Sequence, residues 1–256
     1  MDYCESGDLK HYITKNFYNI KWWDKLVILN KIIEGLKHIH DKKIKHQDFH
    51  SGNILCCGFN NALIGDLGIS KSSTESTNDD DGIYGIIPYV APEIFQEQKY
   101  TAASDIYGFG MIMWELMTGR KPFWDQNHDT ELIIEICDGL RPPIITNAPK
   151  GYIELMQKCW HSDPNKRPTS DCLKERIDNM ANIEFNYLYD GGINATKIVT
   201  SSDIGPVTTN NSGAVYKSRP LSDMIKSAML ARNSRSQSNT SELGNYNVNC
   251  LFTFFF

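Results

Sequence analysis

The feature that most constrains the fold is a polar stretch at residues 46–53, with the sequence HQDFHSGN, followed by Asp66. Residues 54–57 and 62–64 between them are apolar, and residues 58–61, GFNN, are of the types that form turns. Two short apolar runs joined by turn residues are typical of a β-hairpin. The sequence therefore predicts a hairpin of two short strands between the polar stretch and Asp66.

Further along the chain, patterns of apolar residues predict helices. Residues 22–40 carry apolar side chains at the spacing of an amphipathic helix. Residues 104–118 are apolar nearly all round, which predicts a buried helix that begins at Ser104 as N-cap and stops at Gly119. Residues 129–138 and 151–160 predict two more helices.

Five sequence blocks occur in the order of a known family. They are H-x-D-x-x-x-x-N at 46–53, D-x-G at 66–68, A-P-E at 91–93, SDIYGFG at 104–110 and CWHSDPNKRP at 159–168. Each block alone is weak, but together they resemble the eukaryotic protein kinases of the serine/threonine or tyrosine-kinase-like group. The resemblance covers the large C-terminal lobe, which is mainly α-helical and carries its catalytic and metal-binding loops on a short β-hairpin.

The resemblance implies a role for each polar residue. Asp48 would be the catalytic base that accepts the proton of the substrate hydroxyl, and Asn53 and Asp66 would hold Mg²⁺ on ATP. His46 would be a structural prop of this loop, and Asp105 would hydrogen-bond its backbone. The same resemblance predicts a buried ion pair between two more distant residues, Glu93 and Arg167.

Residues 1–9, MDYCESGDL, resemble the hinge between the two kinase lobes, the alternative being a frayed polar terminus. The resemblance places backbone groups of Asp2 and Cys4 at the adenine, Asp8 near the ribose, and Leu55 on the floor of the adenine pocket. The small β-rich lobe would lie upstream of the hinge. Because the chain contains no G-x-G-x-x-G and no V-A-I-K-like block, we expect the small lobe to be missing.

Four positions depart from the family pattern. Gln47 replaces the arginine that pairs with a phosphorylated activation loop, so switching by phosphorylation of the loop at 66–93 is less expected. The serine- and threonine-rich part of that loop is either regulated or simply solvated. His50 and Ile86 replace a lysine and a threonine that meet around the catalytic aspartate in serine/threonine kinases, which puts the strict pattern in doubt. Leu67 replaces a phenylalanine, a milder change.

The composition changes near residue 183, where Ser, Thr and Asn become dominant. We therefore expect a kinase domain at residues 1–182 and a low-complexity, disordered tail at residues 183–256. Within the tail, residues 221–231 have the pattern of a short helix or docking segment, although composition favours an unstructured linker.

Charge and hydropathy limit the partners and the location. A net charge of −5 gives no reason to expect nucleic acid or an anionic membrane as a partner. The N-terminus lacks the form of a signal peptide, and no apolar run approaches the ~20 residues of a membrane span. These observations favour the cytoplasm, and they leave the oligomeric state open.

Two functions remain open at this stage. The first is a protein kinase that transfers the γ-phosphoryl group of ATP, with Mg²⁺, to protein serine or threonine hydroxyls, tyrosine specificity being less expected. The alternative is a catalytically inactive kinase-like module that binds or scaffolds other proteins, because the chain lacks the lysine and the phosphate-covering loop of the small lobe.

Overall fold

Helix α4 (Ala102–Thr118) forms the centre of the protein, as the computed structural model shows. The structure describes residues 7–57, 61–68, 71–72 and 82–248. Every α4 residue from Ser104 to Thr118 is buried, which confirms the predicted buried helix. The helix starts earlier than predicted, because Thr101 is the N-cap and Ser104 lies in the first turn, where the two form a capping box. Gly119 ends the helix with a φ of 75°, as predicted.

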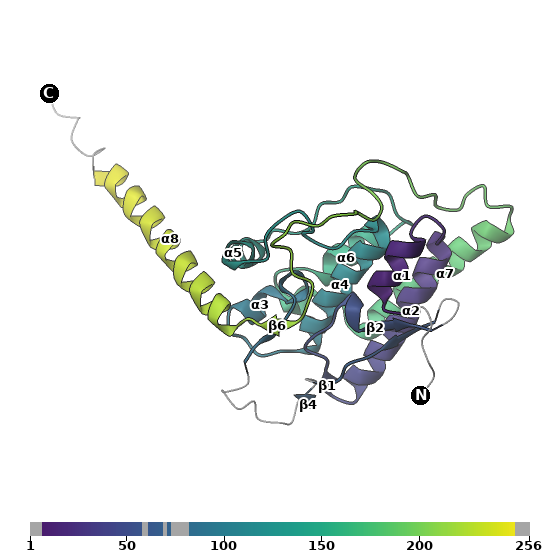
Figure 1. Ribbon diagram of the computed structural model, residues 1–256, viewed down its shortest axis with the longest axis horizontal. Helices are drawn as coiled ribbons and strands as arrows, with labels where there is room; N and C mark the ends of the chain where they lie inside the picture. Colours follow the sequence, from purple (N-terminus) through teal and green to yellow (C-terminus); the bar gives the residue numbers. More distant parts are fainter. Residues whose placement is uncertain (1–6, 58–60, 69–70, 73–81, 249–256) are drawn as a thin grey trace.

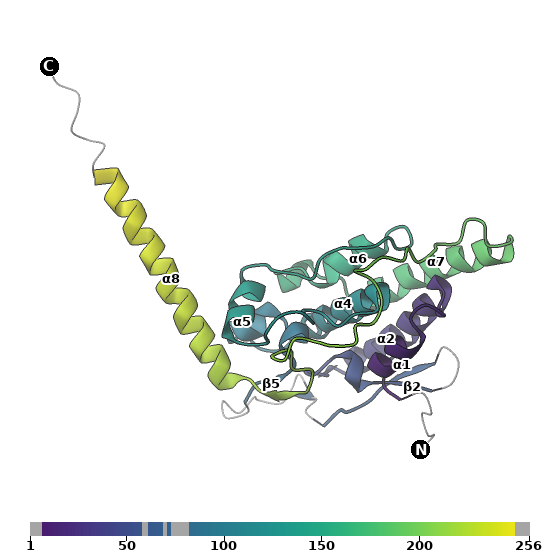
Figure 2. The ribbon, with the colours of Figure 1, turned by 45° about the horizontal axis from the view of Figure 1, so that its top comes forward.

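The other helices of the lobe pack around α4 (Figures 1 and 2). The predicted amphipathic helix is α2 (Trp22–Asp41), which lies along α7 (Ser170–Tyr189) and also contacts α4. Helix α6 (Tyr152–Cys159) packs against α4, and α3 (Pro92–Phe95) packs against α5 (Thr130–Cys137). The chain enters this bundle through α1 (Leu9–Asn16). The helices predicted at 129–138 and 151–160 are thereby confirmed as α5 and α6.

The strands of the described residues are short and form three antiparallel pairs. Strands β2 (Ile54–Cys56) and β3 (Ala62–Ile64) form the predicted hairpin, with Leu55 opposite Leu63. Strand β1 (Ile44–Lys45) pairs with β4 (Lys71–Ser72). The described residues therefore form a mainly helical lobe with a short hairpin, as expected from the sequence, and they include no β-rich lobe.

The C-terminal part of the chain lies against the lobe over much of its length. Helix α7 runs across residue 182 and ends at Tyr189, and the following segment returns over the lobe to β6 (Arg219–Pro220). Strand β6 pairs with β5 (Tyr84–Gly85), and α8 (Ser222–Val248) begins directly afterwards (Figure 1). The helical alternative for residues 221–231 is thus confirmed and the unstructured linker was wrong. The division of the chain at residue 182 stays a prediction.

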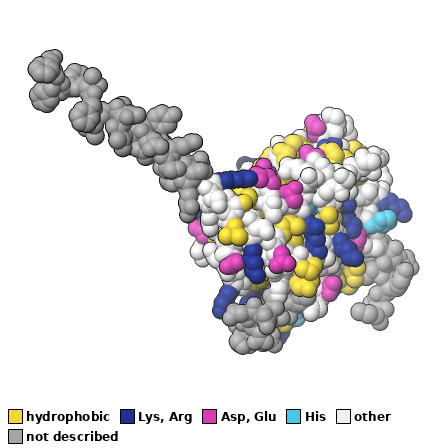
Figure 3. All heavy atoms as spheres, turned by 60° about the vertical axis from the view of Figure 1, so that its left-hand side comes forward, with side chains coloured by type: hydrophobic (Ala, Val, Ile, Leu, Met, Phe, Trp, Pro, Cys, Tyr) yellow, Lys and Arg dark blue, Asp and Glu magenta, His cyan; other side chains and the backbone are white. Residues whose placement is uncertain are grey.

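The molecular surface carries charges of both signs. On the face that Figure 3 shows, Lys and Arg side chains are interspersed with Asp and Glu side chains. None of the helices in the described part of the chain combines the length and apolar character that crossing a lipid bilayer requires.

Candidate active site

The loop that carries Asp48 is hydrogen-bonded to the first turn of α4. The Asp105 carboxylate accepts a hydrogen bond from the backbone N–H of His46 at 2.9 Å and from that of Gln47 at 3.0 Å. Gln47 adopts a φ of 70°, a backbone conformation that residues other than glycine rarely take. The two hydrogen bonds therefore hold a strained backbone in place. The expected support of the loop by Asp105 is confirmed.

The His46 ring is a structural prop, as predicted. The residue is fully buried, and its Nε2 lies 3.0 Å from the carbonyl oxygen of Gly65, directly after β3. Its edge also packs against the ring of Phe49. Through these contacts the ring ties the loop before the hairpin to the loop after it.

Asp48 lies in a largely buried position with a histidine beside its carboxylate. Its Oδ1 is 3.5 Å from Nε2 of His50. Burial on its own would raise the pKa of the Asp48 carboxyl, but the neighbouring His50 ring and a hydrogen bond with the Ser218 hydroxyl outweigh it, so the pKa is lowered. The carboxylate is therefore ionised at neutral pH and can accept a proton or a hydrogen bond.

His50 presents a ring N–H to Asp48 where many serine/threonine kinases present a lysine. Its Nδ1 accepts a hydrogen bond from the backbone N–H of Gly52 at 3.1 Å. Since Nδ1 is the acceptor, Nε2 carries the ring proton and faces the carboxylate. A fixed imidazole thus occupies the place of a long, mobile ammonium group.

Asn53 and Asp66 come together across the base of the hairpin. The Asn53 side-chain nitrogen donates to the backbone oxygen of Asp48 at 3.0 Å, and its backbone oxygen accepts from Gly65 N–H at 2.8 Å. Asp66 follows immediately and is exposed, with its Oδ1 accepting from Gly68 N–H at 3.3 Å. The backbone bond between Gly65 and Asn53 therefore places Asp66 one residue away from the strand position opposite Asn53.

These two side chains fit a magnesium ion that is shared with a phosphate-bearing substrate. Because the amide nitrogen of Asn53 is used, its oxygen is the group left for a cation, and carboxylate and amide oxygens are ligands that Mg²⁺ accepts. In the described residues no group of three or more His, Cys, Asp and Glu side chains could hold a metal on its own. A cation here would therefore complete its shell with water and phosphate oxygens.

The predicted nucleotide contacts are only partly described. Asp8 and Leu55 lie next to each other in a β-bridge, and the backbone N–H of Cys56 donates to the oxygen of Gly7 at 2.9 Å. The Asp8 carboxylate is the N-cap of α1, because it accepts from His11 N–H at 2.7 Å. Leu55 is 39% exposed. The other two predicted contacts, Asp2 and Cys4, lie outside the described residues.

Sequence reasoning missed the buried carboxylate beneath this site. Glu115 accepts hydrogen bonds from Ser51 Oγ at 2.9 Å and from the Tyr89 hydroxyl at 2.7 Å. Burial raises the pKa of Glu115 to about 7, although both hydrogen bonds oppose the shift. Its signal was an acidic residue in the middle of the apolar run 106–118, where a charge has to find buried partners.

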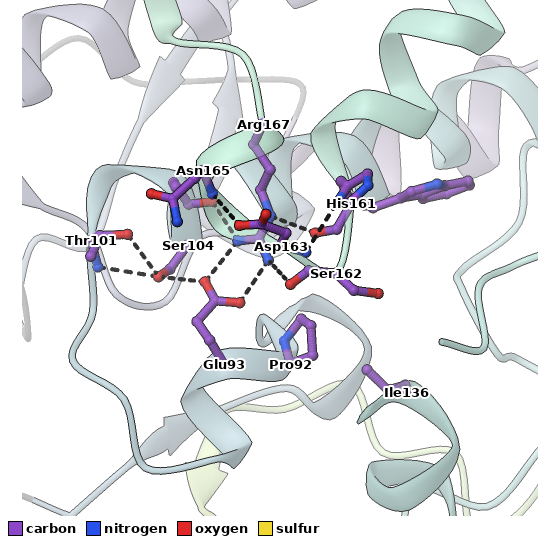
Figure 4. Close-up of polar contacts among 12 residues, drawn as sticks. Pro92, Glu93, Thr101, Ser104, Ile136, His161, Ser162, Asp163, Asn165 and Arg167 are labelled. Carbon is purple, nitrogen blue, oxygen red and sulfur yellow. Dashed lines mark hydrogen bonds and ion pairs between the residues drawn. The ribbon is translucent and has the colours of Figure 1, made fainter. Parts of the chain in front are cut away.

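The predicted ion pair between Glu93 and Arg167 is present and almost fully buried (Figure 4). The two side chains form a bidentate pair, with Nη1 to Oε1 at 2.7 Å and Nη2 to Oε2 at 2.6 Å. Ser104 Oγ also donates to Glu93 at 3.0 Å. The pair joins α3 to the residues before α7 and to the first turn of α4.

A cavity of about 510 Å³ lies in a different part of the lobe. It is lined by the turn before α2, the end of α7 and residues 192–200, and by none of the predicted site residues. The loop that carries Asp48 therefore does not line this cavity.

Comparison with known proteins identifies the family. The family model for protein tyrosine and serine/threonine kinases matches residues 1–177 of the chain. The chain belongs to this kinase family. Its kinase relatives include the probable serine/threonine-protein kinase roco5 of Dictyostelium discoideum, which is 34% identical over 197 residues. Receptor-interacting serine/threonine-protein kinase 4 of Mus musculus is 30% identical over 193 residues, and ephrin type-B receptor 2 of Gallus gallus is 31% identical over 186 residues.

The kinase match covers most of this chain and a small part of each relative. The three alignments span 72%, 70% and 70% of the chain, but only 7%, 24% and 18% of the respective relatives. What the relatives do as whole proteins therefore enters only as a proposal.

Proposed function

We propose that this chain is the large lobe of a protein kinase that transfers the γ-phosphoryl group of ATP to serine or threonine hydroxyls of proteins. The observation that carries the proposal is the Asp48 carboxylate, which is buried, ionised and 3.5 Å from Nε2 of His50. The Asn53 side chain is anchored to the backbone oxygen of Asp48. A hydroxyl that approaches this carboxylate meets a group able to accept its proton.

The remaining site residues have proposed roles around ATP. Asn53 and Asp66 would hold Mg²⁺, which when bound neutralises charge on the phosphates. Leu55 would contact the adenine and Asp8 would lie near the ribose. Asp2 and Cys4 would contribute backbone contacts to the adenine. These assignments come from the family resemblance.

Serine and threonine are the favoured acceptors, and the location we propose is the cytoplasm. Two of these three relatives bear the name serine/threonine-protein kinase. The scaffold alternative is not favoured, because a scaffold has no chemical need for an ionised Asp48 beside an anchored Asn53.

The test is a phosphotransfer assay on the chain in the longest form that its gene encodes. With ATP, Mg²⁺ and dephosphorylated casein, replacing the base by Asp48→Asn should lower the rate by at least about 100-fold, since positioned general bases contribute that much. The exposed Asp125→Asn variant is the matched control and should retain the rate. Full activity of Asp48→Asn, with unchanged thermal unfolding, would remove Asp48 from the mechanism.

A further inference from the structure

The segment after α7 follows a fixed path over the lobe. The backbone N–H of Gly205 donates to the oxygen of Thr118, the last residue of α4, at 2.7 Å, and Ile204 is buried. Further on, Asn211 N–H donates to Trp124 oxygen at 2.9 Å, and His128 N–H donates to Gly213 oxygen at 2.9 Å. These backbone bonds lead the segment toward the loop that carries Asp48.

Tyr216 anchors the segment next to that loop. Its hydroxyl donates to the Pro122 oxygen at 2.8 Å, and its ring packs edge-on against His128. The ring also lines a small pocket whose other walls come from α1, from the loop after Asp48 and from the turn after β5, namely Lys10, His50, Ser51, Gly52, Ile86 and Tyr89. The side chain two residues before Ser218 is therefore seated beside the candidate active site.

Residues 219–221 then run along β5, which lies in the second half of the loop at residues 66–93. Strand β6 pairs antiparallel with β5, with Gly85 opposite Arg219 and Tyr84 opposite Pro220. The Leu221 N–H donates to the Ile83 oxygen at 2.7 Å, and the Leu221 side chain is fully buried. Adding a strand to an exposed edge is a common way to bind an extended peptide, because main-chain bonds supply affinity and pockets supply specificity.

The strand pair lies directly beside the catalytic carboxylate. A Cβ placed on Gly85 would be 3.9 Å from Asp48 Oδ1 and 3.9 Å from Leu221 Cδ1. Ser218 directly precedes Arg219, the residue that pairs with Gly85, and its hydroxyl is among the groups that lower the pKa of the Asp48 carboxyl. An aliphatic hydroxyl at this carboxylate is what the proposed reaction requires of its acceptor.

We propose that residues 216–221 occupy the peptide-substrate position of this lobe, with Ser218 as the acceptor hydroxyl, so that the chain is phosphorylated on its own tail at Ser218. The inference rests on the proposed kinase function for the transfer step. The occupancy of the substrate position rests on the contacts alone.

The transfer step balances with ATP as the donor. A bond forms between Ser218 Oγ and the γ-phosphorus, and the bond between that phosphorus and the β,γ-bridging oxygen breaks. ADP leaves with the electron pair of the broken bond, and the hydroxyl proton passes to the Asp48 carboxylate and then to solvent. The product places a phosphate next to Asp48, where like charges repel, so modification favours release of the segment.

Three neighbouring serines, Ser212, Ser222 and Ser227, are in other surroundings than Ser218, so Ser218 is the acceptor that we assign. Ser222 Oγ accepts a hydrogen bond from Ile83 N–H at 3.0 Å, and Ser227 Oγ donates within its own helix to Asp223 oxygen at 2.9 Å. Ser212 is exposed. Ser212→Ala and Ser227→Ala are therefore matched controls for Ser218→Ala.

The first experiment maps phosphate by mass spectrometry on the chain in the longest form that its gene encodes, incubated with ATP and Mg²⁺. We expect phosphate on Ser218 at a rate independent of protein concentration, and its absence in Ser218→Ala but not in the two control variants. Leu221→Asp, which places a charge in the buried anchor, should slow modification of Ser218 by about tenfold or more. Casein is added to a parallel reaction. If casein is phosphorylated there while Ser218 stays unmodified, the assignment of the acceptor is overturned and the kinase function stands.

A second measurement tests occupancy without any need for activity. Hydrogen exchange of the unmodified chain should show protection at the Leu221 amide, which is bonded to Ile83. Protection should be lost in Leu221→Asp and kept in Ser227→Ala. If neither casein nor Ser218 is phosphorylated, the proposed function fails. Protection at Leu221 would then still support occupancy, and an unprotected Leu221 amide would overturn it.

Discussion

Lys25 is the residue whose burial is hardest to reconcile with its charge. It is fully buried in α2, and within the described structure its Nζ has no hydrogen-bond partner. The ammonium lies 4.0 Å from the ring centre of Phe17 and 5.0 Å from that of Trp22, contacts that offset only part of the lost hydration. Burial accordingly lowers the pKa of Lys25 to about 7.

We expect Lys25→Met to stabilise the protein at pH 7 by roughly 1–4 kcal/mol, since an apolar side chain of similar length avoids the buried charge. Between pH 7 and pH 10.5 the unfolded state binds more protons at Lys25 than the folded state does. The unfolding free energy of the wild type therefore rises with pH across this window, and the advantage of the variant shrinks. Urea denaturation at both ends of the window measures this. Lys31→Met, at an exposed position, should show no such convergence.

The Glu93–Arg167 pair shows the opposite case, a buried charge with complete pairing. Glu93→Ala strands the guanidinium of Arg167 and should cost about 3–5 kcal/mol of unfolding free energy. The exposed pair of Glu154 and Lys158 provides the control, and Glu154→Ala should cost less than about 1 kcal/mol. The double variant Glu93→Leu with Arg167→Met should recover most of the loss. An equal loss of unfolding free energy in Glu93→Ala and Glu154→Ala would contradict the burial of the Glu93–Arg167 pair.

At the scale of elements, the contact between α4 and the catalytic loop depends on a glycine. A Cβ on Gly108 would lie 2.4 Å from the carbonyl oxygen of Phe49, so any larger residue forces the helix and the loop apart. We expect Gly108→Ala to destabilise the protein by about 1–3 kcal/mol and to lower phosphotransfer, in spite of the better helix propensity of alanine.

The control for this contact is another helical glycine. A Cβ on Gly35 would meet only the tip of the Ile64 side chain, at 3.1 Å, which can rotate away. Thermal unfolding and casein phosphorylation of Gly35→Ala should therefore stay near the wild-type values. A Gly108→Ala variant as stable and active as Gly35→Ala would show that the loop does not depend on this approach.

The elements that the sequence predicted well are those with local signals. The hairpin was predicted from two apolar runs and four turn residues. Helix α2 was predicted from its apolar periodicity, and α4 from a run that is apolar nearly all round. The predicted start of α4 at Ser104 was wrong. Thr101 and Ser104 are both residue types that favour the N-cap, and the sequence does not say which of them has the extended backbone of a cap. Of the site, the support by Asp105 and the pair of Glu93 and Arg167 followed from family order, whereas the roles of Asp48, Asn53 and Asp66 stay predictions.

At the scale of the whole molecule, the path of the C-terminal segment was beyond local reasoning. Composition measures how few apolar residues the segment has, and that number predicts disorder for a chain on its own. Here a few anchors suffice, because the lobe supplies the rest of each packing site for Ile204, Leu221, Ile225 and Ala228. The long-range partners of these residues leave no pattern in the segment itself.

The course of residues 190–215 along the lobe also has a consequence for any external substrate. A segment that is tethered this closely behaves as a ligand at an effective concentration on the order of millimolar, whatever the amount of protein present. A free peptide must exceed that level, or bind far more tightly, to displace it. Substrates held near the kinase by a second contact would face the least competition, so selection among targets would depend on co-localisation more than on the sequence around the acceptor.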